Sequence, residues 1–158
     1  MSTTFYVWYP RIIQDGLAGN IGHASIKVES TYMSWWPAEV SLKASFGSGV
    51  AFATPTYESD VHSERKEPDY VGDHFGWDDI KAIQYWNTQC VPSYAHRYNF
   101  VTCNCASMVV NILRASGALD GEVVLNTWLG LKDTFAISPP DITRVSQYFA
   151  GHKAALIL

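Results

Sequence analysis

The sequence predicts a single α+β domain in which an antiparallel sheet packs against a helix that carries a cysteine. Segments with strand-like alternation or short apolar runs occupy the first third of the chain, whereas segments with helical periodicity occupy the second half. Strands followed by helices are typical of α+β folds. The chain has 158 residues, and because one domain commonly has about 100–200 residues, we expect residues 1–158 to form one domain.

The predicted sheet begins with the aromatic segment 5–9, FYVWY. Residues 23–28, HASIKV, alternate as a strand with one apolar face does. After a two-residue turn, residues 32–36, YMSWW, predict the partner strand of a β-hairpin. The segment 48–54, SGVAFAT, predicts a further strand. The polar segment 56–74 predicts a long surface loop, of the kind that often borders a functional site.

Three helices are predicted in the second half of the chain. The first begins at residues 77–79, where two aspartates suit the positive end of a helix dipole, and ends before Pro92. The second covers residues 105–116, in which apolar residues recur at helical spacing, and Gly117 is its C-terminal stop. A weaker third helix is predicted from residue 140 to residue 149.

Charge and hydropathy exclude several classes of partner. The formal net charge is −4 and no basic run exists, whereas nucleic-acid binding requires a positive field, so we expect no nucleic-acid partner. No apolar segment approaches the ~20 residues that cross a bilayer, so we expect no membrane span. The N-terminus lacks the features of a secretory signal. We therefore expect the protein to be cytoplasmic when made, and either to remain there or to be secreted without a signal peptide into a target cell.

Three cysteines are too few for a disulfide framework, and they lack the second pair of ligands that a structural zinc site requires. We therefore expect no metal and no cofactor. Cys90 and Cys103 are interpreted as core or loop residues. Cys105 is the candidate for thiol chemistry. If Asn104 caps the predicted helix, Cys105 lies in its first turn, where the backbone dipoles favour a thiolate.

A thiolate nucleophile needs an imidazole partner, and His23 is the candidate. It follows Gly22 at the end of a glycine-containing loop, residues 16–22, which we expect to clear a cleft. His62 and His74 are reserve candidates. A structural interpretation stands beside the functional one, because a single Cys on an apolar helix face is commonly core, and a single His after a loop is commonly a turn or surface residue.

Three segments resemble a group of bacterial toxin and effector domains: GHASIKV at 22–28, YMSWWP at 32–37 and YNFVTCNCASMVVNILRASGA at 98–118. These domains belong to the circularly permuted branch of the papain-like superfamily of NlpC-type peptidases, a branch that includes relatives of lecithin:retinol acyltransferase. The polar middle of the chain around Asp60, and the tryptophan-bearing segment that follows it, also fit this group. The resemblance implies a permuted papain-like (NlpC-type) fold.

Carried over by position, the resemblance implies that Cys105 is the nucleophile and His23 the general base. The third, orienting residue falls on Ser34, where a carboxylate would orient the imidazole Nδ1–H more strongly than a hydroxyl does. Ser34 acting through water, a backbone carbonyl and Glu29 are the alternatives at this point. The resemblance gives no identity for the second oxyanion donor.

The predicted substrate cleft contains Trp35, Trp36, Asn104 and Gly22. The two tryptophans are alternatively core residues, which is the commoner role of an aromatic pair in a strand.

The sequence therefore predicts a cysteine-dependent hydrolase of amide bonds, a peptidase or amidase of the effector or toxin type. Its substrate is expected to be a peptide, peptidoglycan or a protein, and an immunity protein is left open as a partner. The first alternative is an acyltransferase or thioesterase acting on lipid acyl groups, which calls for a long apolar groove to which Trp35, Trp36 and Trp77 would contribute. The second alternative is a non-catalytic binding module on the same fold.

Overall fold

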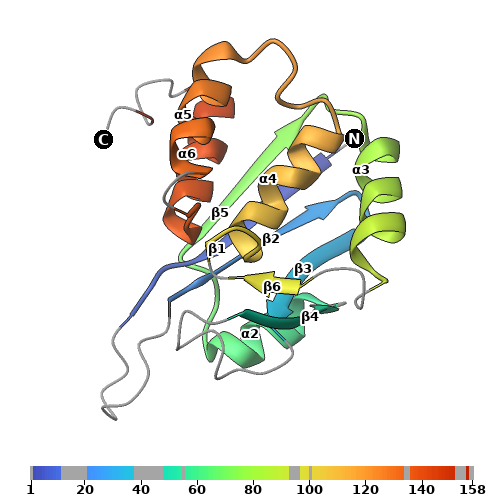
Figure 1. Cartoon of the computed structure of the whole chain (residues 1–158), viewed down its shortest axis with the longest axis vertical. Coiled ribbons are helices and arrows are strands. Elements are labelled where there is room, and N and C mark those ends of the chain that lie inside the picture. The colour runs from blue at the N-terminus through green and yellow to red at the C-terminus, as the bar shows by residue number, and fades with distance from the viewer. Residues whose placement is uncertain are drawn as a thin grey trace.

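The computed structural model of the chain describes residues 2–11, 21–37, 48–54, 56–92, 97–99, 101–133, 136–151 and 156. Its strands are β1 (Ser2–Trp8), β2 (His23–Val28), β3 (Thr31–Pro37), β4 (Ser48–Thr54), β5 (Tyr70–Phe75) and β6 (Arg97–Asn99). Its α-helices are α2 (Tyr57–Glu64), α3 (Asp79–Tyr85), α4 (Cys105–Ala115), α5 (Val123–Asp133) and α6 (Pro139–Phe149) (Figure 1). A π-helical segment, Trp86–Cys90, continues α3. The predicted α+β class is thus confirmed.

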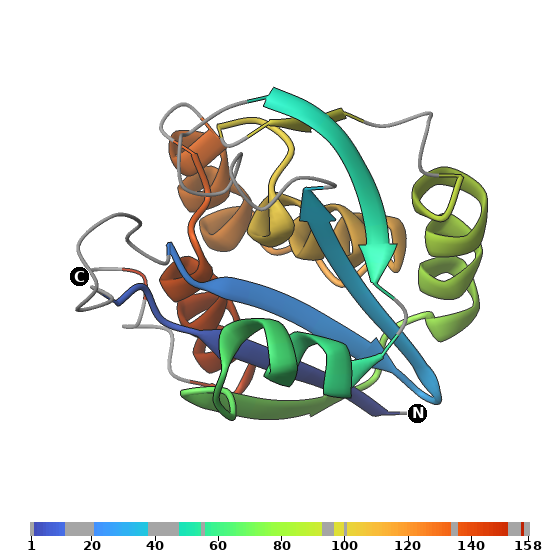
Figure 2. The same cartoon turned by 90° about the horizontal axis from the view of Figure 1, so that it is seen from below.

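The described strands form one antiparallel sheet with the order β5-β1-β2-β3-β4-β6. The predicted hairpin is β2–β3, in which Ser25 is paired with Ser34. Seen from below, the sheet is strongly curved, and α4 lies on its concave side (Figure 2). Helix α4 contacts β2 and β3, and α6 contacts β1 and β5.

Alternation along the hairpin divides the sheet into an apolar and a polar face. The apolar face of β2 and β3 is buried in the core together with α4, through residues Ala24, Ile26, Val28, Met33 and Trp35. Because successive side chains of a strand point to opposite faces, His23 and Ser25 belong to the other face, as do Tyr32, Ser34 and Trp36. Helix α2 meets this polar face.

The predicted surface loop over residues 56–74 was wrong, because it contains α2 and β5. Thr56 caps α2 by accepting a hydrogen bond from the backbone N–H of Ser59. The buried side chains of α2 are Asp60 and Glu64, one turn apart. A helix whose buried face is acidic has no apolar periodicity, so the signal used for the other helices is missing from it.

The three predicted helices are present with boundaries close to those expected. Asp78 caps α3, and the π-helical segment ends at Cys90, before Pro92. Helix α4 ends at Ala115, and Gly117 has the positive φ of 76° that a C-terminal stop requires. Helix α6 begins at Pro139 and ends at Phe149. Helix α5, in contrast, had no counterpart in the sequence prediction.

Gly22 is the glycine of the predicted loop that the structure describes; Gly16 and Gly19 lie outside the described residues. Its φ is +82°, and a Cβ atom would lie 2.4 Å from the carbonyl oxygen of Trp8. Only glycine fits where β1 and β2 approach so closely. Gly22 therefore fixes the place of His23 at the end of β2.

We expect Gly22→Ala to lower the free energy of unfolding by roughly 1–3 kcal/mol, because the substitution combines a strained backbone with a steric clash. Gly130→Ala is the matched control, since Gly130 lies in α5 and a Cβ there would meet nothing within 4 Å. The control should raise stability by up to about 1 kcal/mol through helix propensity. Urea denaturation measures both variants, and equal effects of the two would contradict this view of Gly22.

Candidate active site

Cys105 is the first residue of α4, as the sequence predicts. Asn104 caps the helix: its side-chain oxygen accepts from the backbone N–H of Ser107, while the hydroxyl of Ser107 accepts from the backbone N–H of Asn104. This reciprocal pair is a capping box. The Asn104 amide also donates to the carbonyl oxygen of Ile137 at 2.9 Å, which joins the N-terminus of α4 to the segment before α6. Cys105 is therefore held on rigid backbone.

The imidazole of His23 is buried, with 1% of its surface exposed. Its Nε2 atom lies 3.0 Å from Asp60 Oδ2 and 2.8 Å from Ser34 Oγ. The Ser34 hydroxyl in turn donates to Asp60 Oδ2 at 2.7 Å. Ser34 is thus part of the site, but it acts together with a carboxylate that the sequence analysis had given no role. Glu29, one of the alternatives to Ser34, is exposed and bonds the backbone N–H of Ser2 instead.

Asp60 is fully buried, and hydrogen-bond donors from both strands of the hairpin surround it. Tyr32 donates to Oδ2 at 2.6 Å, and the indole N–H of Trp36 donates to Oδ1 at 2.7 Å. Burial alone would raise the pKa of Asp60, but the charge of His23 and these hydrogen bonds lower it, and the net pKa lies below the ordinary 3.8. Asp60 therefore carries a negative charge at neutral pH.

The charge of Asp60 changes the protonation of His23. Burial lowers the pKa of the imidazole, but Asp60 and Cys105 raise it more strongly, through charge and through hydrogen bonds, from 6.5 to about 9. At neutral pH the ring is consequently an imidazolium. An imidazolium beside a thiol favours the thiolate form of that thiol.

Cys105 and Asp60 both interact with the His23 ring. The structure therefore brings together Cys105 and His23, the two residues on which the sequence prediction depends. The orienting contact is made at Nε2, not at Nδ1 as the sequence analysis expected. Nε2 faces Asp60 and Ser34, and Cys105 also interacts with the ring. The three residues are of the types that make up a carboxylate–imidazole–thiol triad.

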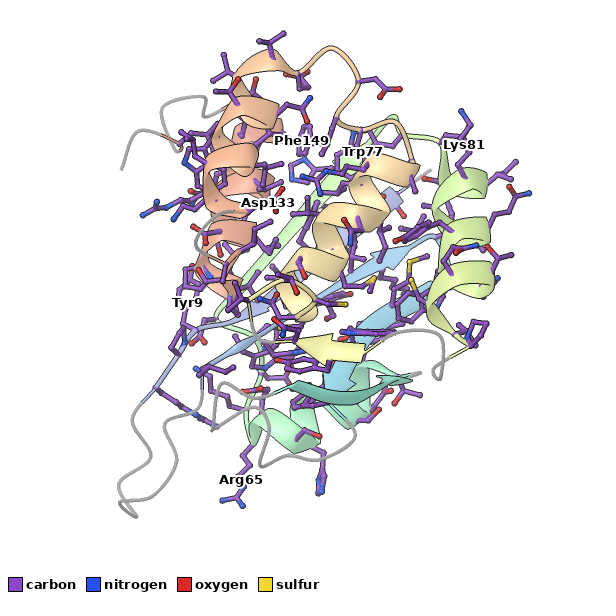
Figure 3. All side chains as sticks on the ribbon, in the orientation of Figure 1. Tyr9, Arg65, Trp77, Lys81, Asp133 and Phe149 are labelled. Atoms are coloured by element: carbon purple, nitrogen blue, oxygen red, sulfur yellow. The ribbon has the colours of Figure 1, made fainter. Side chains whose placement is uncertain are left out.

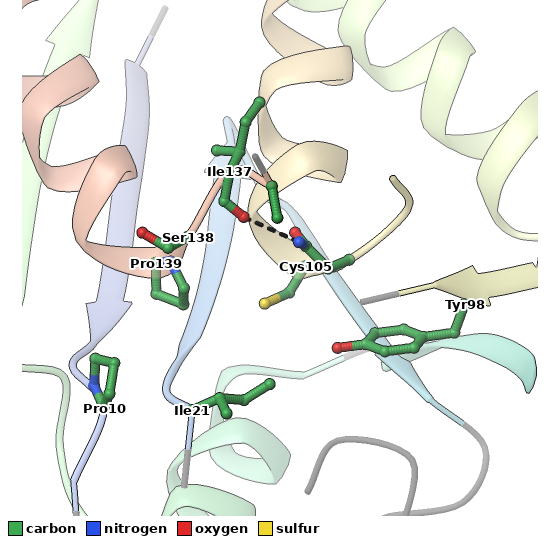
Figure 4. Close-up of a pocket in the computed structure, with 9 residues that line it drawn as sticks. Pro10, Ile21, Tyr98, Cys105, Ile137, Ser138 and Pro139 are labelled. Atoms are coloured by element: carbon green, nitrogen blue, oxygen red, sulfur yellow. Dashed lines mark hydrogen bonds between the residues drawn. The ribbon is translucent and has the colours of Figure 1, made fainter. Parts of the chain in front are cut away.

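The four residues predicted to line a cleft have different positions. Asn104 lines a pocket beside Cys105 (Figure 4). Trp35 is 1% exposed and belongs to the core. Trp36 stacks on the ring of His23, with centroids 4.4 Å apart, and so supports the imidazole. Gly22 acts through its backbone at the end of β2.

The pocket at Cys105 contains a residue that the sequence analysis missed. Tyr98 is 1% exposed and lines the pocket, with its hydroxyl directed into it (Figure 4). Among the described residues, this hydroxyl has no hydrogen-bond partner. Burial and the nearby Cys105 raise the pKa of Tyr98, so the hydroxyl stays protonated and is able to donate. Tyr98 is the first residue of the third segment on which the resemblance rests, seven residues before Cys105, but the sequence analysis gave it no role.

The reserve histidines lie elsewhere. His62 is exposed on α2. His74 is buried, contrary to its surface assignment, and its Nε2 lies 2.8 Å from Ser146 Oγ. Trp77 packs edge-on against Phe149, with centroids 4.8 Å apart, near the C-terminal end of α4 (Figure 3). Trp77 is therefore at the opposite end of α4 from Cys105.

The remaining cysteines have environments unlike that of Cys105. Cys90 is buried against Met108, with 3.3 Å between the two sulfur atoms, and burial together with Cys103 raises the pKa of its thiol to about 12. Burial likewise raises the pKa of Cys103. Over the part of the chain that the structure describes, no group of three or more His, Cys, Asp or Glu side chains is arranged to hold a metal ion. None of the helices described has the length and apolar character to cross a membrane.

Comparison with protein-family models, with curated proteins and with solved structures found no match to this chain. The functional argument consequently depends on the geometry of Cys105, His23 and Asp60 and on the chemistry of their surroundings.

We expect the Asp60 charge to appear as a pH-dependent contribution to stability. A raised folded-state pKa of His23 stabilises the protein fully below about pH 6.5, and this contribution is lost as the pH rises through about 9. It amounts to about 1.4 kcal/mol for each unit by which the pKa is raised. The measurement is urea unfolding between pH 6 and pH 9.5 in a Cys105→Ala background, which removes the titration of the thiol itself.

In that background Cys105 no longer raises the pKa of His23, so the decline that begins near pH 6.5 ends below pH 9, and Asp60→Asn should abolish it. Glu58→Gln is the control, because Glu58 carries the same charge on the same helix but is exposed. An unchanged decline in Asp60→Asn would show that Asp60 does not hold the proton on His23.

Proposed function

We propose that this protein is a cysteine-dependent hydrolase of amide bonds, with Cys105 as the nucleophile, His23 as the acid and base, and Asp60 as the residue that orients and charges His23. The observation that carries the proposal is the buried His23 ring, which interacts with both Asp60 and Cys105. Perturbed titratable groups that converge on a pocket are typical of catalytic sites. The roles of effector or toxin, and of an immunity protein as partner, rest on the sequence resemblance.

The first half of the reaction forms a thioester. The Cys105 thiolate attacks the carbonyl carbon of the amide, and the carbonyl electron pair moves onto oxygen to give a tetrahedral oxyanion. As the C–N bond breaks, the His23 imidazolium gives its proton to the leaving nitrogen, and the amine departs. His23 is then neutral, and Asp60 and Ser34 hold its ring in place.

The second half restores the enzyme. Neutral His23 accepts a proton from water as the water oxygen attacks the thioester carbonyl, and a second tetrahedral oxyanion forms. The oxyanion then collapses, the C–S bond breaks, and the product leaves as a carboxylic acid that gives its proton to solvent water, while Cys105 and His23 return to the thiolate and imidazolium forms. The stack of Trp36 on His23 keeps the ring in one orientation through both halves.

The oxyanion of each half-reaction needs donors placed before it forms. We propose the backbone N–H of Cys105 as one donor and the hydroxyl of Tyr98 as the other. Support for Tyr98 comes from its position in the wall of the same pocket and from a buried hydroxyl that the described residues leave unbonded. Burying a hydroxyl without a partner costs about 1–3 kcal/mol, so a developing negative charge nearby would receive a ready donor.

We expect Cys105→Ala to lower hydrolysis more than about a thousandfold, because it removes the nucleophile. The protein is incubated with peptidoglycan sacculi and, separately, with a mixture of unfolded proteins in H₂¹⁸O, and products are analysed by mass spectrometry. Hydrolysis adds one solvent oxygen to each new carboxylate, whereas acyl transfer adds none. Cys103→Ala is the matched control, two residues away, and should keep its activity; equal activity of the Cys105→Ala variant would exclude the mechanism.

We expect Tyr98→Phe to lower kcat about 10²–10³-fold with little change in KM, because it removes one oxyanion donor and leaves the ring in place. Alkylation of Cys105 by iodoacetamide forms no oxyanion, so its rate should be unchanged. Tyr70→Phe is the control, since the Tyr70 hydroxyl contacts Ser146 away from the pocket. If Tyr98→Phe slowed alkylation and hydrolysis equally, Tyr98 would have a structural role.

A further inference from the structure

The pocket beside Cys105 has an uncharged wall. Its volume is about 270 Å³, and the described residues that line it are Pro10, Ile21, Tyr98, Asn104, Cys105, Ala136, Ile137, Ser138 and Pro139 (Figure 4). None of these nine side chains is an Asp, Glu, Lys, Arg or His. Apolar surface comes from three described segments of the chain, through Pro10, Ile21, Ile137 and Pro139.

The polar side chains of this wall are mostly engaged within the fold. The Asn104 amide bonds Ser107 on one side and the carbonyl oxygen of Ile137 on the other. The hydroxyl of Ser138 donates to Asp141 Oδ2 at 2.6 Å. Beyond the nucleophile itself, the hydroxyl of Tyr98 is the polar group of the described wall that a ligand would meet.

The carboxylate nearest in sequence to this wall is also neutralised. Asp141 is 5% exposed and forms an ion pair with Lys132 at 3.0 Å, while its other oxygen accepts from the backbone N–H and hydroxyl of Ser138. Its charge is therefore compensated by Lys132 of α5 and by the N-terminal cap of α6. Apart from the nucleophile Cys105, the described lining residues offer no counterion to a charged ligand group that entered the pocket, and a buried unpaired charge costs several kcal/mol.

On the basis of the proposed function, we propose that this pocket binds an uncharged apolar group attached to the scissile carbonyl. The volume lies near the lower end of the roughly 300–1,000 Å³ typical of ligand pockets. It suits one aliphatic or aromatic side chain, or a short acyl chain, and is too small for a whole fatty acid. Peptides and proteins with an apolar residue at this position are thus favoured as substrates over the charged residues of peptidoglycan stem peptides.

Binding is tested in Cys105→Ala, which has no nucleophile and therefore reports on the pocket whether or not the protein is an enzyme. Four N-acetyl amino-acid methylamides, of Leu, Phe, Glu and Lys, are titrated and followed by NMR at pH 7. We expect the Leu and Phe compounds to bind at least tenfold more tightly than the Glu and Lys compounds. N-methylhexanamide is the fifth probe, and its affinity relative to the Leu compound distinguishes a short acyl chain from a peptide side chain as the natural occupant.

The pocket itself is tested at Ile21, which is half-buried in its wall. Ile21→Asp should reverse the order, so that the Lys compound binds more tightly than the Leu compound. Asn has the shape of Asp without its charge, so Ile21→Asn should weaken binding of the Leu compound without strengthening binding of the Lys compound. Thermal unfolding of both variants shows whether they are equally folded.

The proposal is overturned if the Glu or Lys compound binds to Cys105→Ala as tightly as the Leu compound, or if no probe binds. It is likewise overturned if Ile21→Asp and Ile21→Asn show the same preference between the Lys and Leu compounds. Failure of the hydrolase proposal alone would give a different result. The wild-type protein would then hydrolyse none of the substrates, while Cys105→Ala would still bind the apolar probes more tightly.

Discussion

The buried pair of Asp60 and His23 constrains the architecture around it. A carboxylate with no exposure is tolerated only when opposite charge and hydrogen-bond donors replace the lost water. Those donors come from the hairpin, and Asp60 itself comes from α2, so the helix and the two strands must dock in one relative position. A slip of one residue between β2 and β3 would turn one strand's polar side chains away from Asp60. The pairing of Ser25 with Ser34 is consequently tied to the chemistry of the site as well as to the core.

The nucleophile reaches this pair from a different part of the fold. Helix α4 packs on the apolar face of the hairpin, whereas Asp60 contacts the polar face, and His23 lies at the strand end where the two sides meet. The capping box holds Cys105 at the head of α4, and Asn104 extends that hold to Ile137. The same contacts that fix Cys105 therefore build the wall of the pocket, so the position of the thiol and the shape of the pocket depend on one another.

Local signals in the sequence were sufficient for part of this arrangement. The hairpin and α4 were predictable because alternation, helical spacing, a cap and a C-terminal glycine all lie within short segments. Helix α2 was not, because its buried side chains are acids whose partners are distant in sequence. Ser34 was placed correctly in the site, yet its neighbour Asp60 was found only once the fold brought α2 to the hairpin. Tyr98 shows the same limit, since an unbonded hydroxyl is a property of three-dimensional surroundings.

The energetic cost of the site argues for catalysis over simple binding. A buried ion pair contributes little to stability and can often be replaced by apolar residues without loss, so it is a poor choice for a fold that needs only a core. Here a buried carboxylate and an imidazolium adjoin one thiol, and that thiol lines a small pocket together with a tyrosine hydroxyl that the described residues leave unbonded. A module that bound an apolar group would need the uncharged wall alone. Besides fixing how α2 docks on the hairpin, the charged half of the site is suited to proton transfer, and it lies next to the thiol that the proposed mechanism requires.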